Sequence, residues 1–181
     1  MANTFIPRTE EPSEDNIYYR VTRVGGLNEC IEIMGSGSAL PNCVGYAWGR
    51  AYEIMGKRPT LSKADAEKWY GNTSDGYTRS QTARIGAIAC WSKGSVTDDS
   101  DGAGHVAVVE QINVDGSIVT SNSDYSGRRF YTRTFTGIPT MTNYHFQGYI
   151  YLPIDVTPGG SDTPITPTTK NKKKNIFIWE I

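Results

Sequence analysis

The stretch HVAVVEQINVDGSIVTSN, residues 105–122, places two runs rich in β-branched residues on either side of a turn. Residues 105–112 and 117–122 have the composition that is typical of strands. Between them, Asp115 and Gly116 form a dipeptide that strongly favours a hairpin turn. The stretch therefore predicts an antiparallel β-hairpin.

The hairpin decides which polar side chains share a face with His105. Side chains alternate along a strand, so Asn122 and Asp124 fall on the His105 face and Glu110 falls on the other. A two-residue turn places Val109 opposite Asn122, whereas a four-residue turn places His105 opposite Asp124. In both registers an Asn or Asp lies close enough to orient the imidazole, because cross-strand Cβ atoms are only ~4.5 to 8 Å apart. An ordinary solvent-exposed strand end is the alternative for these polar residues.

Other segments predict two helices and three more strands. The first helix begins after Asn42, a favoured N-cap, and ends at Gly56. Apolar residues recur along it at helical spacing. A second helix is expected over 62–70, and further strands over 86–91, 128–135 and 147–153. The fold class is therefore α+β, with N-terminal helices packed on an antiparallel sheet.

Cys43 stands at the start of the first helix, directly after Asn42. Helix N-termini carry partial positive charge and unpaired N–H groups, which favour a thiolate and can hold an oxyanion. This position suits a nucleophile, although a small buried thiol is the simpler alternative. Of the two histidines, His105 is the better candidate base, and His145, which lies among aromatic residues, is assigned a structural role.

Composition and charge exclude several classes of function. The chain has 181 residues, with 18 basic and 19 acidic side chains and a net charge of −1, so it lacks the charge of a nucleic-acid-binding protein. No apolar run approaches the ~18 residues of a membrane span. Three cysteines without a CxxC spacing argue against zinc and leave at least one free thiol. Cys90 is expected in the core, and Cys30 is left undecided.

Composition also divides the chain. Residues 1–34 form a polar lead-in without the features of a signal peptide, which is expected to pack on the domain. Residues 35–155 are expected to form the domain that carries the candidate catalytic residues, and 156–181 a linker and tail rich in Pro, Thr and Lys. The last residues, NIFIWEI, either begin a second module that is truncated here, dock as a strand, or form a disordered tail.

Four motifs together resemble one known family. They are NCVGYAWGR (42–50), GAIACW (86–91), GAGHVAVVE (102–110) and SNSDYSG (121–127). In this order they resemble the CHAP family of cysteine, histidine-dependent amidohydrolases/peptidases, over about residues 35–152. The resemblance implies a papain-like fold and hydrolysis of an amide bond in peptidoglycan, without a cofactor. The bond is either the muramoyl–L-alanine amide or a peptide bond of the stem or cross-bridge.

The lead-in IPRTEEPSEDNIYY resembles segments that precede this domain in phage endolysins. It implies a bacteriophage lysin or virion hydrolase, made in the host cytoplasm and acting on the walls of Gram-positive bacteria. The partner is then peptidoglycan, with no nucleic acid and no membrane, and the catalytic domain is expected to be a monomer.

Position within the motifs implies roles for individual residues. Cys43 matches the nucleophile and His105 the general base. Asn122 is the first choice for the residue that orients His105, and Asp124 is the alternative, because many members have Glu and Asn at these two positions. Asn42 either contributes to the oxyanion hole or only caps the helix.

Two further expectations concern the surroundings of the site. Trp91, Tyr125 and Trp69 are candidate walls of a substrate groove. No metal is expected, because MGSGSALPN, the stretch before Cys43, lacks carboxylates, and the weakly calcium-like loop with Asp98, Asp99 and Asp101 is read as solvated. The alternatives to a wall hydrolase are a papain-like protease acting on proteins, and a wall-binding module whose catalytic site has decayed.

Overall fold

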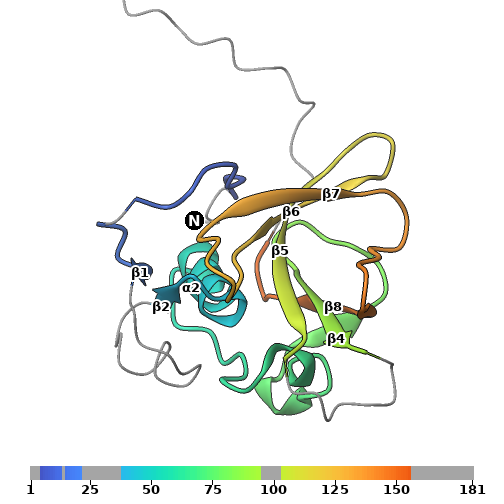
Figure 1. The fold of residues 1–181 in the computed structure, drawn as a ribbon, viewed down its shortest axis with the longest axis horizontal. Coiled ribbons are helices and arrows are strands. Elements are labelled where there is room, and N and C mark those ends of the chain that lie inside the picture. Colours follow the sequence, from blue (N-terminus) through green and yellow to red (C-terminus); the bar gives the residue numbers. More distant parts are fainter. Residues whose placement is uncertain (1–4, 14, 22–37, 95–102, 156–181) are drawn as a thin grey trace, which may run out of the picture.

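The computed structural model describes residues 5–13, 15–21, 38–94 and 103–155 (Figure 1). Within these ranges there is one α-helix, two 3-10 turns and two β-sheets, and no helix is long and apolar enough to cross a membrane. The tail 156–181 and residues 22–37, which include the end of the predicted lead-in, lie outside the described residues.

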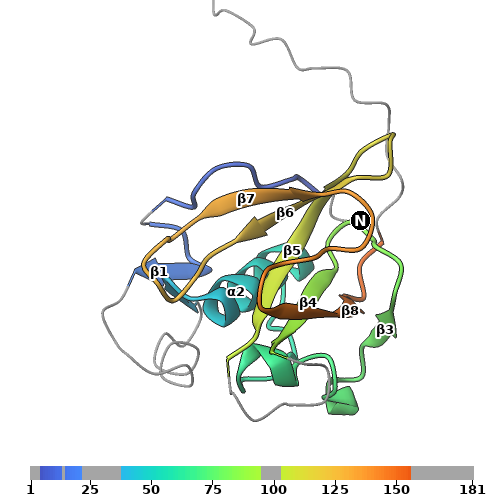
Figure 2. The ribbon, with the colours of Figure 1, turned by 45° about the vertical axis from the view of Figure 1, so that its right-hand side comes forward.

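A six-stranded antiparallel sheet forms the centre of the molecule, with the strand order β3-β8-β4-β5-β6-β7 (Figure 2). Its strands are β3 (Thr78–Ser80), β4 (Ile88–Lys93), β5 (His105–Ile112), β6 (Ile118–Asn122), β7 (Tyr131–Phe135) and β8 (Tyr144–Tyr151). A separate parallel pair consists of β1 (Tyr19–Val21) and β2 (Ser38–Leu40). The predicted α+β class is confirmed.

The predicted hairpin is formed by β5 and β6, but its register contains a bulge. Ile112 pairs with Ile118, whereas beyond the bulge Val108 pairs with Ser121. The extra residue is Glu110, which has no partner in the β6 register. Asn122 ends β6 on the same face as His105, as the alternation of side chains predicts.

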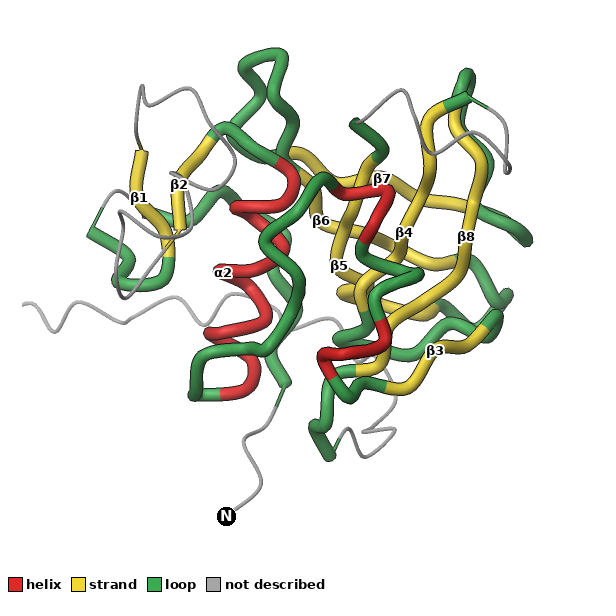
Figure 3. Tube along the Cα trace, turned by 90° about the horizontal axis from the view of Figure 1, so that it is seen from below, coloured by secondary structure: helices red, strands yellow, loops and turns green. Residues whose placement is uncertain are grey.

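Helix α2 (Cys43–Met55) begins and ends where its capping residues predict. The side-chain oxygen of Asn42 accepts a hydrogen bond from the Gly45 N–H at 2.9 Å. Gly56 takes a left-handed conformation (φ 66°) and its N–H bonds to the Tyr52 carbonyl. The helix packs on one face of β5, with the chain that follows it running nearby (Figure 3).

The predicted second helix, 62–70, is wrong. Only the 3-10 turn η1 (Ala66–Lys68) forms there, and Asp65 before it is extended, with ψ of 148°. The Ser62 hydroxyl accepts a hydrogen bond from the Ala64 N–H, a local bond that competes with helix formation.

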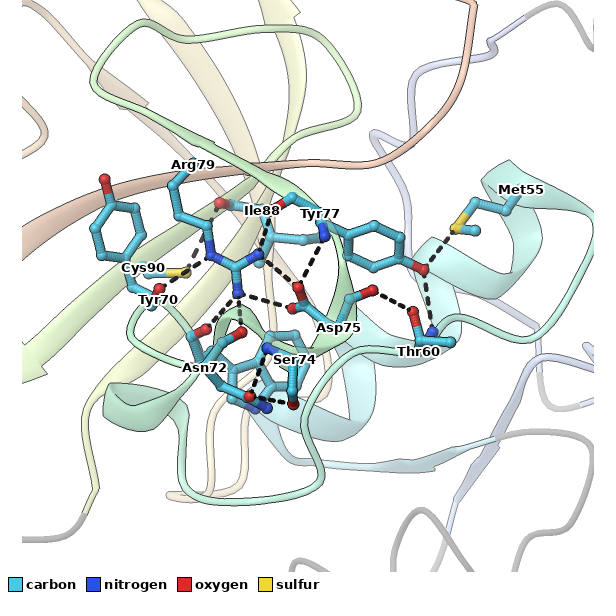
Figure 4. Close-up of polar contacts among 11 residues, drawn as sticks. Met55, Thr60, Tyr70, Asn72, Ser74, Asp75, Tyr77, Arg79, Ile88 and Cys90 are labelled. Atoms are coloured by element: carbon cyan, nitrogen blue, oxygen red, sulfur yellow. Dashed lines mark hydrogen bonds and ion pairs between the residues drawn. The ribbon is translucent and has the colours of Figure 1, made fainter.

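Arg79 holds the segment between η1 and β3 in place (Figure 4). Its guanidinium pairs with Asp75, at 2.6 Å and 2.8 Å, close to the second 3-10 turn, η2 (Thr73–Asp75). It also donates to the carbonyl oxygens of Trp69, Tyr70, Asn72 and Tyr77. One partly buried cation thus satisfies backbone carbonyl groups of a segment that forms no regular helix.

Apolar side chains fill both faces of the sheet. The larger cluster lies between α2 and the sheet and contains Val44, Trp48, Cys90, Val106 and Val108. The opposite face carries a second cluster, around Trp91 and Phe135. His105 and Asn122 belong to this second face, at the end of the sheet where α2 begins.

A buried ion pair joins α2 to β5, and the N-terminal segment hydrogen-bonds to both of its members. Arg50 of α2 donates to both carboxylate oxygens of Glu110, at 2.9 Å and 2.8 Å. The Arg8 backbone N–H also bonds Glu110, and the Ile6 carbonyl accepts from Arg50. Segments about 100 residues apart in sequence are joined at this carboxylate.

Candidate active site

Cys43 is the first residue of α2; the residue is partly exposed, and its thiol is not in a disulfide. The backbone N–H of Val106 hydrogen-bonds to Cys43, so the thiol lies beside the first residues of β5. His105 directly precedes Val106. The helix start therefore places Cys43, the predicted nucleophile, beside the strand residue that follows His105, the predicted base.

A hydrogen bond of 3.0 Å joins His105 Nε2 to Asn122 Oδ1. The amide orientation of Asn122 is determined by its other contacts, since Nδ2 donates to the Thr120 carbonyl and hydroxyl and to the Tyr131 carbonyl. Oδ1 must then accept, so Nε2 of His105 carries the proton. This tautomer leaves Nδ1 as the basic nitrogen, available to take a proton from a thiol.

Aromatic rings enclose the imidazole of His105. The Trp91 ring centroid lies 5.7 Å from that of His105, and Tyr144 meets it edge-on at 6.4 Å. Burial lowers the pKa of His105, whereas the hydrogen bond that His105 donates to Asn122 raises it. The imidazole is therefore neutral at neutral pH.

Burial also raises the pKa of the Cys43 thiol, to about 11. The N–H groups of Val106, Val44 and Cys43 itself act in the opposite direction. The helix start thus has the thiolate-stabilising effect that the sequence suggests, but burial outweighs it. In the free protein the pair consists of a thiol and a neutral imidazole.

Asp124, the alternative partner for His105, is engaged elsewhere. Its Oδ1 accepts from the N–H and hydroxyl of Ser126, and its Oδ2 accepts from Arg128 Nε at 2.7 Å. The carboxylate therefore closes the turn after β6 and makes no hydrogen bond to the imidazole. Its charge nevertheless acts on both Cys43 and His105, raising the pKa of each.

The model of the CHAP domain family matches residues 34–124, just over half of the chain. The chain belongs to the CHAP domain family. Its curated relatives include the N-acetylmuramoyl-L-alanine amidases sle1 of Staphylococcus saprophyticus, 30% identical over 65% of this chain and 38% of the relative, and of Staphylococcus epidermidis, 30% identical over 56% and 32%. The chain spans about a third of the length of these relatives.

A crystal structure of an N-acetylmuramoyl-L-alanine amidase from Staphylococcus aureus is also similar in sequence, with 31% identity. The match covers 53% of this chain and 27% of that one, with a TM-score of 0.43.

Asn42 of the CHAP domain is almost fully buried. Its side-chain oxygen caps α2, and its backbone N–H donates to the Ser123 hydroxyl at 3.0 Å. This second bond ties the residue before Cys43 to the residue after Asn122. Asn42 therefore positions the helix start relative to β6.

Two of the three expected groove walls belong to the core. Trp91 is 0% exposed and its Nε1 donates to the Pro139 carbonyl. Trp69 is 1% exposed and its Nε1 donates to the Ala64 carbonyl. Neither ring can contact a substrate, and Trp91 instead supports His105. Tyr125, at 67% exposed, remains available as a groove wall.

The remaining predicted sites are only partly covered by the structure. Asp98, Asp99 and Asp101 lie outside the described residues, as does Cys30. Among the described residues, no group of three or more His, Cys, Asp or Glu side chains could hold a metal ion. Cys90 is a fully buried thiol of the core, and burial raises its pKa.

Sequence reasoning missed the residues that hold Asn122. Thr120 and Tyr131 accept the hydrogen bonds of its amide, and Tyr131 pairs with it in the β6–β7 register. The polar alternation of 117–122 placed Thr120 on the same face, which was an available signal. The role of Tyr131 could not be predicted without knowing that β6 pairs with β7, because a loop separates the two strands in the sequence.

Proposed function

We propose that this chain is a peptidoglycan hydrolase that cleaves an amide bond with Cys43 as nucleophile and His105 as general acid and base. The observation that carries the proposal is the His105–Asn122 hydrogen bond, which leaves Nδ1 of His105 as the basic nitrogen. Membership of the CHAP domain family and the amidase names of the relatives support the substrate class.

The proposed reaction begins from two neutral groups. His105 Nδ1 takes the thiol proton as Cys43 Sγ attacks the scissile carbonyl, and Asn122 Oδ1 stabilises the imidazolium that forms. The Cys43 N–H and the Asn42 side chain are the candidate donors to the oxyanion. His105 then protonates the leaving amine, and water hydrolyses the thioester with His105 as base.

The finer assignment follows the relatives. The muramoyl–L-alanine amide is the first candidate for the scissile bond, because the relatives are named for cleaving it. A peptide bond of the stem or cross-bridge is the alternative. We assign the chain to the walls of Gram-positive bacteria, as a monomeric catalytic domain of an endolysin or virion hydrolase of phage origin, with antibacterial use.

Loss of turbidity in a suspension of Gram-positive cells tests the proposal. The wild-type chain should lyse the cells and leave casein intact, and Cys43→Ala should remove lysis without unfolding the protein. Cys90→Ala is the matched control, because it removes a fully buried thiol of the core that makes no hydrogen bond to His105, and it should retain lysis. Lysis by Cys43→Ala would contradict the mechanism, cleavage of casein would favour the protein protease, and wall binding without new amine termini would favour a decayed module.

A further inference from the structure

A row of charged and aromatic side chains borders the site along the β6–β7 connection. We call Asp124, Arg128, Tyr131 and Arg133 the β7 rim. Tyr131 pairs with Asn122 and Arg133 pairs with Thr120, so both side chains lie on the face that carries His105. The rim is therefore the part of β7 that flanks the imidazole and its partner.

Arg128 is held in one orientation although its side chain is 63% exposed. Its Nε and one terminal nitrogen bind Asp124 Oδ2, at 2.7 Å and 2.6 Å. The guanidinium carbon lies 3.9 Å from the centroid of the Tyr131 ring. Carboxylate and ring together preorganise this cation, and Asp124 neutralises its charge.

Arg133 differs from Arg128 in having no carboxylate partner in the part of the chain that the structure describes. Its guanidinium lies over the Phe135 ring at 5.0 Å and is exposed. The rim thus contains two guanidinium groups and one carboxylate, which leaves one positive charge uncompensated. The whole chain has a net charge of −1, so this charge is a local feature.

The rim is close enough to act on the reacting groups. Arg133 and Arg128 both lower the pKa of His105. Burial raises the pKa of Tyr131, and the Cys43 thiol adds to that rise. The β7 rim therefore interacts electrostatically with both residues of the proposed catalytic pair. A substrate whose scissile amide lies at Cys43 would have its neighbouring groups beside this rim.

We propose that Arg133, with the Arg128–Tyr131 stack beside it, forms a subsite that binds a carboxylate of the wall peptide next to the scissile amide. A guanidinium held against a ring presents its N–H edge to solvent, and this edge matches a carboxylate in two parallel hydrogen bonds. The subsite would make the enzyme prefer peptides with a free carboxylate over those with a carboxamide. This inference rests on the proposed function.

The test compares two forms of one wall preparation. Purified peptidoglycan, freed of phosphate-bearing polymers, is acetylated at its amines, and half is amidated with carbodiimide and ammonia. The initial rate of release of new primary amines at low wall concentration then reports kcat/KM. The wild-type chain should cleave the carboxylate wall about 10-fold faster than the amidated wall. Arg133→Gln should cleave both at the lower rate, and Arg133→Lys should keep part of the preference.

Arg58→Gln is the matched control. Arg58 is also an exposed arginine over an aromatic ring, 5.6 Å from Trp48, but it follows the far end of α2. Its loss should leave the preference unchanged. Thermal unfolding of each variant checks folding, which these exposed side chains should not affect.

Binding by Cys43→Ala separates the subsite from the proposed function. This variant should pellet more strongly with the carboxylate wall than with the amidated wall, and the added Arg133→Gln change should remove the difference. If the wild-type chain releases no amines but the binding difference depends on Arg133, the function fails and the subsite stands. Equal rates and equal binding on both walls, or a preference that survives Arg133→Gln, would overturn the subsite.

Discussion

Asn122 determines which nitrogen of His105 is basic, because three acceptors hold its amide nitrogen and leave only its oxygen for the imidazole. The strand pattern predicted both Asn122 and Asp124 on the His105 face, and only the family resemblance made Asn122 the first choice. The choice depends on the bulge at Glu110 and on a turn that Asp124 itself closes. The alternation of residues along a strand reveals neither feature.

Replacement of Asn122 tests this role through the pH dependence of activity. Burial keeps the pKa of His105 below its usual value, so the acid limb of kcat/KM in the wild-type chain should lie below pH 6.5. Asn122→Ala removes a hydrogen bond that raises this pKa. The limb should then move to lower pH, while kcat/KM falls about 10²-fold because the imidazole is no longer oriented.

Asn122→Asp provides the opposite change, because a carboxylate keeps the acceptor and adds a charge that raises the pKa of His105. Its acid limb should move to higher pH. Shifts of the two variants in the same direction would contradict the assignment of Asn122.

Alkylation of Cys43 reports the resting state of the thiol. Because burial raises its pKa to about 11, the rate of reaction with iodoacetamide should keep rising as the pH increases from 9 to 11. Mass spectrometry of the peptide that contains Cys43 measures this rate separately from the other cysteines. A rate that is already constant near neutral pH would show a resting thiolate–imidazolium pair instead.

At the scale of elements, the strongly patterned segments were predictable and the short ones were not. The β5–β6 hairpin and α2 have clear turn, cap and periodicity signals, and both form with nearly the predicted bounds. The predicted helix over 62–70 is replaced by a turn that Arg79 stabilises from the following strand, a contact that no local pattern reveals. The three-residue strand β3 is too short to show alternation.

The Arg50–Glu110 pair joins helix and sheet, and its loss should destabilise the fold. Glu110 is fully buried, so Glu110→Ala leaves the Arg50 guanidinium without its main partner. We expect the free energy of unfolding in urea to fall by about 3–5 kcal/mol. Glu53→Ala removes a partly exposed partner of the same arginine and should cost less than half as much. Equal decreases in the free energy of unfolding for the two variants would show that the buried ion pair contributes no more than the partly exposed one.

At the scale of the whole molecule, the candidate site lies where three separate segments meet. Asn42 and Cys43 come from the start of α2, His105 from the start of β5, and Asn122 from the end of β6, with Ser123 tying the last to the first. The sequence motifs identified the CHAP family, and they contain the four residues that these segments contribute. The core positions of Trp69 and Trp91 were not predictable, since the two rings could be recognised as core only after the strands were paired.

Mass spectrometry of purified peptidoglycan after digestion tests the central claim most directly. The wild-type chain should produce fragments with new amine termini at a single type of amide bond, with the muramoyl–L-alanine bond as the first candidate. Cys43→Ala at the same concentration should produce none. The same fragments from Cys43→Ala, or no new termini from the wild-type chain, would contradict a thiol-dependent amide hydrolase.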